Sequence, residues 1–278
     1  MMNIAAQPVG VDLEASPALQ ILGPLRFSVD NRHGTIGANR VRTLLAVLGL
    51  TPREVVSIDF LVEELFGEIP SKNPKNALQA NIRRLRSFLE QTTGVPGNLL
   101  VRTSNNGYLL DLPSEAVDAR RFEALAAKGA GLVRDRPLEA IAVLEEALRL
   151  WRGPALLDVA GGHRCRTQAS LLNNQRVASL EDLYGARLAV GVDDRNTVQG
   201  LEQLAAEHPE RERISELLML ALYRTGRQGE ALAAFQRVRS WLKSELGLEP
   251  GKSMRRIQQA ILAQDPAIDA RPFSETLP

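Results

Sequence analysis

The sequence predicts a mainly α-helical protein with a small β component. An N-terminal domain mixes helices with strands, and a second domain is all-helical. Three observations lead to this fold class: a basic amphipathic helix lies near residue 80, runs of β-forming residues stand on both sides of it, and strand patterns are missing after residue 113. The chain has 278 residues, of which 44% are hydrophobic and 24% are charged, so about two globular domains are expected.

The first eighteen residues mix Ala, Gln, Pro, Val and Gly without a period, and we expect a disordered tail there. From Leu19 the run LQILGPLRFSV is rich in β-formers and is interrupted by Gly23-Pro24. Residues 30–34 (DNRHG) are typical of a turn, and Thr35-Ile36 of a returning strand. The chain therefore begins with a small antiparallel sheet.

Three helices are expected next. The spacing of apolar residues predicts a first helix over 39–50. A second, shorter helix is predicted over 59–66, with Ser57 or Asp59 as its N-cap. Pro74 is well placed to begin the third helix, because its fixed φ suits the first helical position.

The third helix has one apolar face and one basic face. Four large apolar side chains recur at i, i+4, i+7 and i+11: Leu78, Ile82, Leu85 and Leu89. The opposite face carries amides, guanidiniums and two small side chains, but no carboxylate: Asn73, Asn76, Ala80, Arg83, Arg84 and Ser87. Such a helix suits the DNA major groove, where Arg can fork onto guanine and Asn onto adenine. A solvated basic helix is the alternative interpretation.

A hairpin follows at residues 99–112, LLVRTSNNGYLLDL. Two apolar strands flank Asn105-Asn106-Gly107, which is a signal for a type I′ turn. The order of sheet, three helices and hairpin is that of a winged helix-turn-helix. In that fold the recognition helix enters the major groove and the hairpin, or wing, lies beside the backbone or the minor groove.

This arrangement predicts which residues contact DNA. Base reading is expected from Asn76 and Arg83, and from Gln79 toward the flank of the face. Phosphate contacts are expected from Lys72, Lys75, Arg84 and Arg102. The predicted DNA-binding set is Lys75, Asn76, Gln79, Ala80, Arg83, Arg84, Ser87, Arg102, Thr103 and Asn105.

Charge and composition exclude several other classes. Residues 19–112 carry 11 Lys/Arg against 8 Asp/Glu, so a positive excess coincides with the candidate helix. The single cysteine, Cys165, cannot form an internal disulfide or a thiolate metal cluster. No apolar run is long enough to span a membrane and no signal peptide is evident, so we expect a cytoplasmic protein without a membrane partner.

The sequence offers no enzyme site, metal site or cofactor site. The three histidines are scattered and form no triad or metal spacing: His33, His163 and His208. Residues 247–253 (GLEPGKS) resemble a P-loop, but one residue is missing between the glycines and the motif follows a helix instead of a strand. We therefore expect no enzyme.

The second half of the chain consists of predicted helices joined by short polar loops. Residues 139–151 (EAIAVLEEALRLW) echo residues 230–242 (EALAAFQRVRSWL), and residues 219–235 match the tetratricopeptide pattern, in which alanines let two antiparallel helices approach. The predicted division is a tail, a winged-helix domain, a tetratricopeptide-like domain and a second tail: 1–18, 19–113, 114–265 and 266–278.

In the order of its motifs, the chain resembles the SARP family of antibiotic regulatory activators. The resemblance covers residues 19–264 and rests on LQILGPLRF, RVRTLLAVL, VVSIDFLVEELFGEIP, NALQANIRRLR and NNGYLLDL, and then on LWRGPALLDVA, LMLALYRTGRQGEALAAFQRVR and ELGLEPG. It implies a winged helix joined to a bacterial transcriptional activation domain, in an activator of a secondary-metabolite gene cluster.

The resemblance also implies partners. Members bind direct repeats in double-stranded promoter DNA as side-by-side protomers and recruit the RNA polymerase holoenzyme, through its sigma factor and the C-terminal domain of its alpha subunit. By this resemblance the loop 67–74 would face the polymerase, with contacts from Glu68, Ser71, Lys72 and Asn73. The alternative is a tetratricopeptide-like scaffold that binds proteins and no specific DNA.

Overall fold

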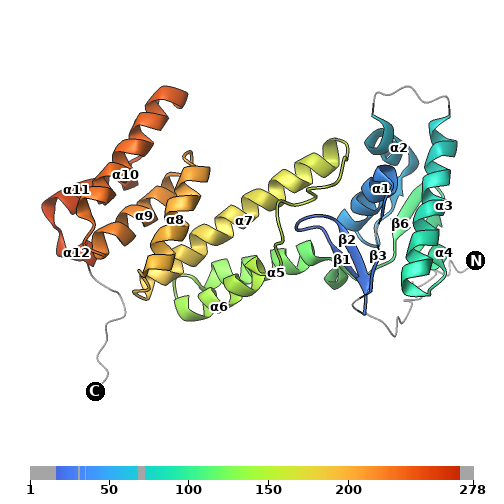
Figure 1. Cartoon of the computed structure of the whole chain (residues 1–278), viewed down its shortest axis with the longest axis horizontal. Helices are drawn as coiled ribbons and strands as arrows, with labels where there is room; N and C mark the ends of the chain where they lie inside the picture. The colour runs from blue at the N-terminus through green and yellow to red at the C-terminus, as the bar shows by residue number, and fades with distance from the viewer. Residues whose placement is uncertain (1–16, 31, 35, 68–72, 270–278) are drawn as a thin grey trace, which may run out of the picture. The chain divides into compact units, whose positions relative to one another are not determined.

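The computed structural model describes residues 17–269, apart from 31, 35 and 68–72. It divides into two compact units (Figure 1). Unit 1 comprises residues 1–124 and 149–175, and unit 2 comprises residues 125–148 and 176–278. Helices α5 and α7, whose bounds are given below, each contribute residues to both units.

The N-terminal elements are β1 (Pro17–Gln20), β2 (Arg26–Val29), β3 (Arg32–Gly34), α1 (Asn39–Leu50), β4 (Val56–Ser57), α2 (Ile58–Phe66), α3 (Pro74–Thr93), α4 (Gly97–Leu100), β5 (Val101–Ser104), β6 (Gly107–Leu110) and η1 (Ser114–Ala116). The later elements are α5 (Asp118–Leu132), α6 (Pro137–Leu148), α7 (His163–Ala189), α8 (Arg195–Glu207), α9 (Glu212–Arg224), α10 (Gln228–Trp241), η2 (Leu242–Leu246), α11 (Lys252–Ala263) and α12 (Pro266–Asp269). Among the described residues no strand follows Leu110, so the mainly helical fold class is confirmed.

The first sheet is antiparallel, in the order β1-β2-β3. Leu19 pairs with Phe27, and Phe27 with Gly34. The predicted turn over 30–34 was therefore too long, and the strand expected at Thr35-Ile36 begins at Arg32 instead. The chain reverses earlier because Asp30 adopts a left-handed φ of 45°.

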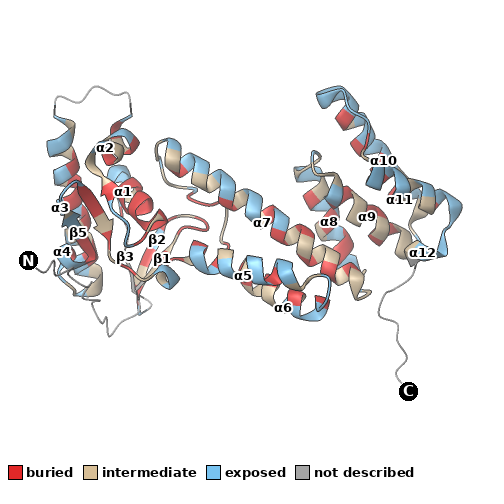
Figure 2. Cartoon of the chain, turned by 180° about the vertical axis from the view of Figure 1, so that it is seen from behind, coloured by how far each residue is buried: buried red, intermediate tan, exposed pale blue. Residues whose placement is uncertain are grey.

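The three predicted helices of the winged helix are confirmed. α1 has the predicted bounds, and α2 begins one residue early, at Ile58. The Ser57 hydroxyl caps α2 by accepting the N–H of Phe60 at 3.3 Å. Figure 2 shows their buried residues on the faces that turn toward one another, and Leu44, Leu61 and Leu85 are fully buried.

The second sheet has the order β4-β6-β5, and strand β4 was not predicted. The hairpin β5–β6 is confirmed, with Asn105 and Asn106 as its two-residue loop. Neither asparagine is among the described residues with positive φ, so the type I′ assignment was wrong. Gly107 is required by close packing and not by the turn. A Cβ at this position would lie 2.1 Å from the Val56 carbonyl oxygen, so glycine permits β4 to pair with β6.

Residues 149–175 pack within unit 1 against the first sheet. The backbone N–H of Arg152 donates to the Leu22 carbonyl at 2.8 Å, and the N–H of Leu25 donates to Asp158 Oδ1 at 2.7 Å. Phe122 and Trp151 meet edge to face, with their ring centroids 5.1 Å apart. Unit 1 therefore includes residues 149–175, which the predicted domain division assigns to the second domain, 114–265.

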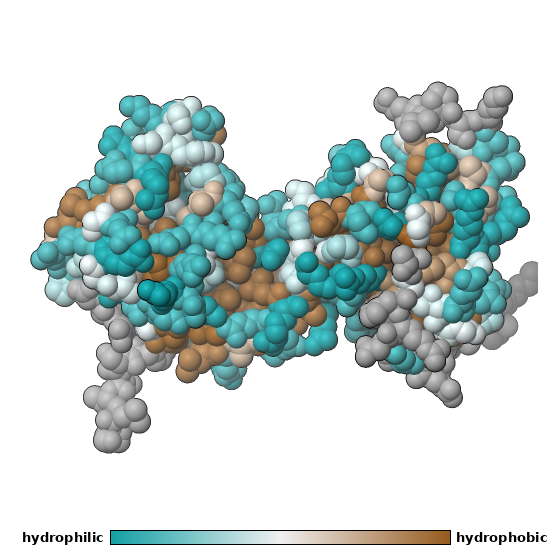
Figure 3. Space-filling model, viewed as in Figure 1, coloured by the Kyte–Doolittle hydropathy of each residue, from teal (hydrophilic) through white to brown (hydrophobic). Residues whose placement is uncertain are grey.

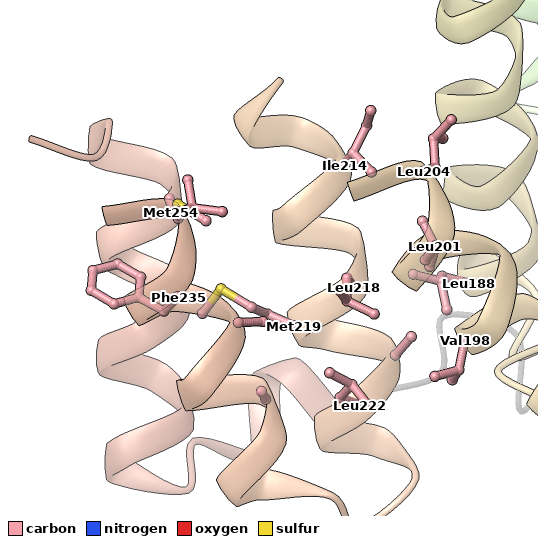
Figure 4. Close-up of a cluster of buried hydrophobic side chains, with 14 of the residues drawn as sticks. Leu188, Val198, Leu201, Leu204, Ile214, Leu218, Met219, Leu222, Phe235 and Met254 are labelled. Atoms are coloured by element: carbon pink, nitrogen blue, oxygen red, sulfur yellow. The ribbon is translucent and has the colours of Figure 1, made fainter. Parts of the chain in front are cut away.

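Unit 2 contains antiparallel helix pairs. The chain turns between α9 and α10 at Gly226, whose φ is +78°, and Ala221 and Ala234 are buried in the core of these helices. Figure 4 shows Leu218 of α9 on the side facing α8 and Met219 on the side facing Phe235 of α10. The helix α10 continues beyond Trp241 as π-helical η2, and the segment predicted as a tail from residue 266 begins with α12.

Candidate nucleic-acid interface

Helix α3 is anchored by the apolar stripe that its spacing predicts. Leu78, Ile82, Leu85 and Leu89 are all at most 2% exposed. Asn81 is also buried, and its side-chain amide donates to the Ala77 carbonyl at 2.8 Å, which satisfies one of its donors within the helix. Gly94 ends the helix with a left-handed φ of 74°. The helix is therefore fixed in rotation, and its other face is held toward solvent.

The solvent face of α3 carries most of the predicted contact residues. Lys75, Asn76, Gln79, Arg83, Arg84 and Ser87 are exposed, and Ala80 is half-buried. In Figure 3 the surface over α3, at the right edge of the view, is mostly teal, the colour of hydrophilic residues. Among the described residues, none buries this face, so a partner can reach it.

The guanidiniums at the centre of this face have no protein partner. Among the residues that the structure describes, neither Arg83 nor Arg84 makes a hydrogen bond or an ion pair. Lys75 Nζ lies 3.6 Å from Asp59 Oδ1 of α2, and both side chains are exposed, so solvent screens this pair and little free energy opposes its opening. The three cations are thus available to phosphate or base acceptors.

One residue of the predicted polymerase loop, Asn73, also has a structural role at the N-terminus of α3. Asn73 Oδ1 accepts the backbone N–H of Asn76 at 3.2 Å, so Asn73 is the N-cap of the helix. Its side chain remains exposed. The other three residues predicted for that loop, Glu68, Ser71 and Lys72, lie outside the described residues.

Arg86 joins the wing to the recognition helix. Its Nε donates to the Val101 carbonyl at 2.9 Å, and its Nη2 donates to Thr103 Oγ1 at 2.8 Å. Thr103 is exposed, and because its oxygen accepts from Arg86, its hydroxyl proton remains free to donate to a phosphate. In the sequence analysis, Arg86 is included only among the 11 Lys/Arg of residues 19–112. Its position four residues after buried Ile82, beside the apolar stripe, is the signal that points to this role.

Arg102 and Arg53 both pair with the carboxylate of Asp111, and the sequence analysis singled out neither Arg53 nor Asp111. Asp111, whose side chain is 7% exposed, lies 3.0 Å from Arg53 Nε and 3.2 Å from Arg102 Nη1. Roughly half of the Arg102 side chain remains exposed. Asn105 is exposed at the wing tip, and the neighbouring Asn106 carbonyl accepts the N–H of Ile58 at 3.0 Å, which ties the tip to the start of α2.

Metal-ligand clusters and membrane-spanning helices are absent from the described part of the chain. It contains no group of three or more His, Cys, Asp or Glu side chains able to hold a metal ion, and none of its helices is long and apolar enough to cross a membrane. Burial raises the pKa of the Cys165 thiol to about 12, so this cysteine is a thiol at neutral pH and a poor nucleophile.

The chain matches known proteins over both halves. Residues 36–110 match the model "Transcriptional regulatory protein, C terminal", and residues 117–262 match "Bacterial transcriptional activator domain". Transcriptional regulator RedD of Streptomyces coelicolor is 43% identical over 251 residues, which cover 90% of this chain and 71% of RedD. Regulatory protein DnrI of Streptomyces peucetius is 34% identical over 256 residues, which cover 90% of this chain and 94% of DnrI. The chain belongs to the SARP family of transcriptional regulators.

A solved structure agrees with this SARP assignment. Mycobacterium tuberculosis EmbR, solved in complex with a low-affinity phosphopeptide, matches with a TM-score of 0.84 and 29% sequence identity. The match covers 92% of this chain and 69% of the EmbR chain. Within this SARP chain the first family model runs from before α1 to the end of β6, so it includes every residue of the predicted DNA-binding set.

Proposed function

We propose that this SARP-family regulator is a sequence-specific DNA-binding activator whose helix α3 lies in the major groove. One observation carries the proposal. Over residues 74–87 the exposed face of α3 presents Asn76, Arg83 and Arg84 without a carboxylate, directly opposite a buried apolar stripe. A solvated basic helix would have a similar face, but a major-groove reader requires amide and guanidinium groups that are exposed on a rigidly held helix, as they are here.

The residues divide into base-reading and phosphate-binding groups. Arg83, unpaired and central, is suited to fork onto guanine O6 and N7, and Asn76 onto adenine. Lys75 and Arg84 would contact phosphates beside the groove, and Arg102 would do so from the wing. Arg86 would contribute by holding the wing at a fixed distance from α3.

The family supports a further proposal about partners. Side-by-side protomers would bind direct repeats in the promoter of a secondary-metabolite cluster. The loop 67–74 would contact RNA polymerase through the sigma factor, and a further contact would involve the C-terminal domain of the polymerase alpha chain. The relatives RedD and DnrI carry the names of regulators, which supports a role in transcription.

A gel shift with promoter fragments at several salt concentrations tests DNA binding. The three phosphate contacts proposed for each protomer predict that the logarithm of the binding constant falls with log salt with a slope of about −3 per bound protomer. A specific complex with this dependence supports the activator. Failure to bind any promoter fragment at low salt would leave the tetratricopeptide-like scaffold as the function.

The polymerase contact is tested separately with Lys72→Ala. We expect the variant to retain most of its affinity for DNA in the gel shift and to lose activation in a reconstituted transcription assay. Equal losses in the two assays would assign Lys72 to DNA, and no loss in either would remove it from both interfaces.

A further inference from the structure

Unit 2 contains a groove that DNA binding does not use. Its volume is about 430 Å³, and residues of α8, α9 and α10 line it. The apolar part of the lining includes Ala206, Leu218, Val238 and Trp241. Leu218, Val238 and Trp241 also contact the core of unit 2, so these walls are firmly supported.

Ser215 lies at the floor of this groove with an unused hydroxyl. The residue is 1% exposed, and its Oγ has no hydrogen-bond partner in the described part of the chain. A serine within a helix commonly donates to the carbonyl four residues earlier, yet Ser215 does not. Buried hydroxyls are almost always hydrogen-bonded, so an unsatisfied one that lines a groove indicates a place for a polar atom of a bound molecule.

Arg237 supplies a charge at the rim. It is exposed, lines the groove, and makes no hydrogen bond or ion pair with any residue that the structure describes. The acidic residue in the lining, Glu202, lies 3.2 Å from Arg227, and Arg227 also pairs with Glu230. These side chains and Arg237 sum to no net charge, and Arg237 is the cation in the lining whose guanidinium can donate directly to an anionic group on the occupant.

We propose that this groove binds a small, mainly apolar molecule that carries aromatic rings and one anionic oxygen group. The rings would lie against Trp241 and Leu218, the anionic group would meet Arg237, and a polar ring substituent would pair with Ser215. The volume falls within the range of about 300–1,000 Å³ that small-molecule sites occupy, with apolar walls and a few polar groups. Because every lining residue belongs to unit 2, this site is independent of the proposed contacts with DNA.

The probe 1-anilinonaphthalene-8-sulfonate has the required chemistry, with fused aromatic rings and a sulfonate. Its emission, excited directly and by energy transfer from tryptophan, would be titrated against the full-length protein. A probe seated in the groove lies beside Trp241, so energy transfer should saturate together with direct emission. We expect saturable binding at one site per chain.

Three variants locate the probe. Ala206→Phe fills the groove from its exposed rim and should abolish saturable binding. Arg237→Gln removes the charge and should weaken binding about tenfold, as for the loss of a charge-assisted contact. Ala178→Leu enlarges an exposed alanine of α7 outside the lining and should leave binding unchanged.

Three outcomes would overturn the proposal. The first is the absence of saturable binding to the unmodified protein, and the second is equal binding by all three variants. The third is a change in molar mass on sedimentation of Ala206→Phe, which would assign the groove to an interface between copies of the chain. Circular dichroism of each variant verifies that its helices are intact, and the substituted residues in all three are exposed.

Discussion

Glu64 Oε1 accepts a 2.7 Å hydrogen bond from the backbone N–H of Arg164, so a carboxylate of α2 binds the first turn of α7. Oε2 lies 3.4 Å from the N–H of Cys165. Glu64 is 6% exposed, and a Cβ on Gly162 would come within 2.9 Å of it, so glycine makes room for the carboxylate. An anion at a helix N-terminus satisfies free N–H groups and interacts favourably with the helix dipole. This contact secures α2, the helix from which the chain enters the predicted polymerase loop.

Replacing Glu64 should therefore destabilise unit 1. Glu64→Ala leaves two N–H groups of α7 without their acceptor, and we expect the free energy of unfolding to fall by about 1–3 kcal/mol. Urea denaturation measures the change. Glu63→Ala, on the exposed side of the same helix, is the matched control and should change stability by less than about 0.5 kcal/mol. Equal midpoints for the two variants would show that the cap contributes nothing.

Arg83 should determine one position of the operator. Arg83→Ala should cost about 1–3 kcal/mol of binding free energy and relax specificity at a single base pair, because a guanidinium that forks onto guanine is lost. Gel shifts against operators substituted one base at a time measure this. Arg134→Ala, an exposed arginine outside the winged helix, is the control. A uniform loss across all sequences would make Arg83 a phosphate contact instead.

The recognition helix and its neighbours were predictable because local patterns determine them. The period of Leu78, Ile82 and Leu85 gave the buried face of α3, and Ser57 and Pro74 gave the starts of two helices. The exposed face then followed by geometry, since side chains opposite a buried stripe must meet solvent.

Contacts between distant segments were not predictable in this way. Strand β4 has two residues, too few for a pattern, and exists because β6 lies beside it. The partnership of Glu64 with α7 spans 100 residues, and a glutamate in an amphipathic helix carries no mark of a distant partner. Likewise, the side chain of Arg86 differs from those of Arg83 and Arg84 only in its direction around the helix axis, and the sequence does not show that this direction leads to Val101 and Thr103.

Arg86 should control the position of the wing. Arg86→Met keeps the aliphatic stem but removes the hydrogen bonds to Val101 and Thr103, so we expect faster amide hydrogen exchange in β5 and weaker DNA binding. Exchange followed by mass spectrometry on residues 101–104 measures the first effect. Arg84→Met should weaken DNA binding without altering exchange in β5. Were the two variants to give the same exchange, the clamp would have no role in holding the wing.

The pKa of Asp118 should depend on its burial at the first sheet. Burial raises this pKa above 3.8, against the lowering effect of the N–H groups of Ile21 and Leu22, which donate to the carboxylate, and of Arg152. The folded state thus favours the protonated carboxyl relative to the unfolded chain. The contribution of Asp118 to the free energy of unfolding is therefore fully present below pH 3.8, the pKa of the unfolded chain, and is lost as pH rises through the raised pKa of the folded state.

Carbon-detected NMR of the side-chain carboxyls tests the order of titration. Asp194, the exposed N-cap of α8, has a pKa below 3.8 because the N–H of Thr197 donates to it, so it should titrate at lower pH than Asp118. Stability measured by urea should fall, relative to Asp118→Asn, as pH rises across the Asp118 titration. Titration of Asp118 at or below the pH of Asp194 would contradict the effect of burial.

Gly107 should be intolerant of any side chain, even the smallest. Gly107→Ala places a Cβ 2.1 Å from the Val56 carbonyl oxygen, and backbone cannot yield as a flexible side chain can, so β4 must separate from β6. We expect a loss of about 1–3 kcal/mol in the free energy of unfolding and weaker DNA binding, because β6 carries the wing. Gly131→Ala, in α5 with open space around it, is the matched substitution and should stabilise by about 0.4–1 kcal/mol. If Gly107→Ala also stabilised the protein, the close approach of β4 would not be what requires glycine at the wing.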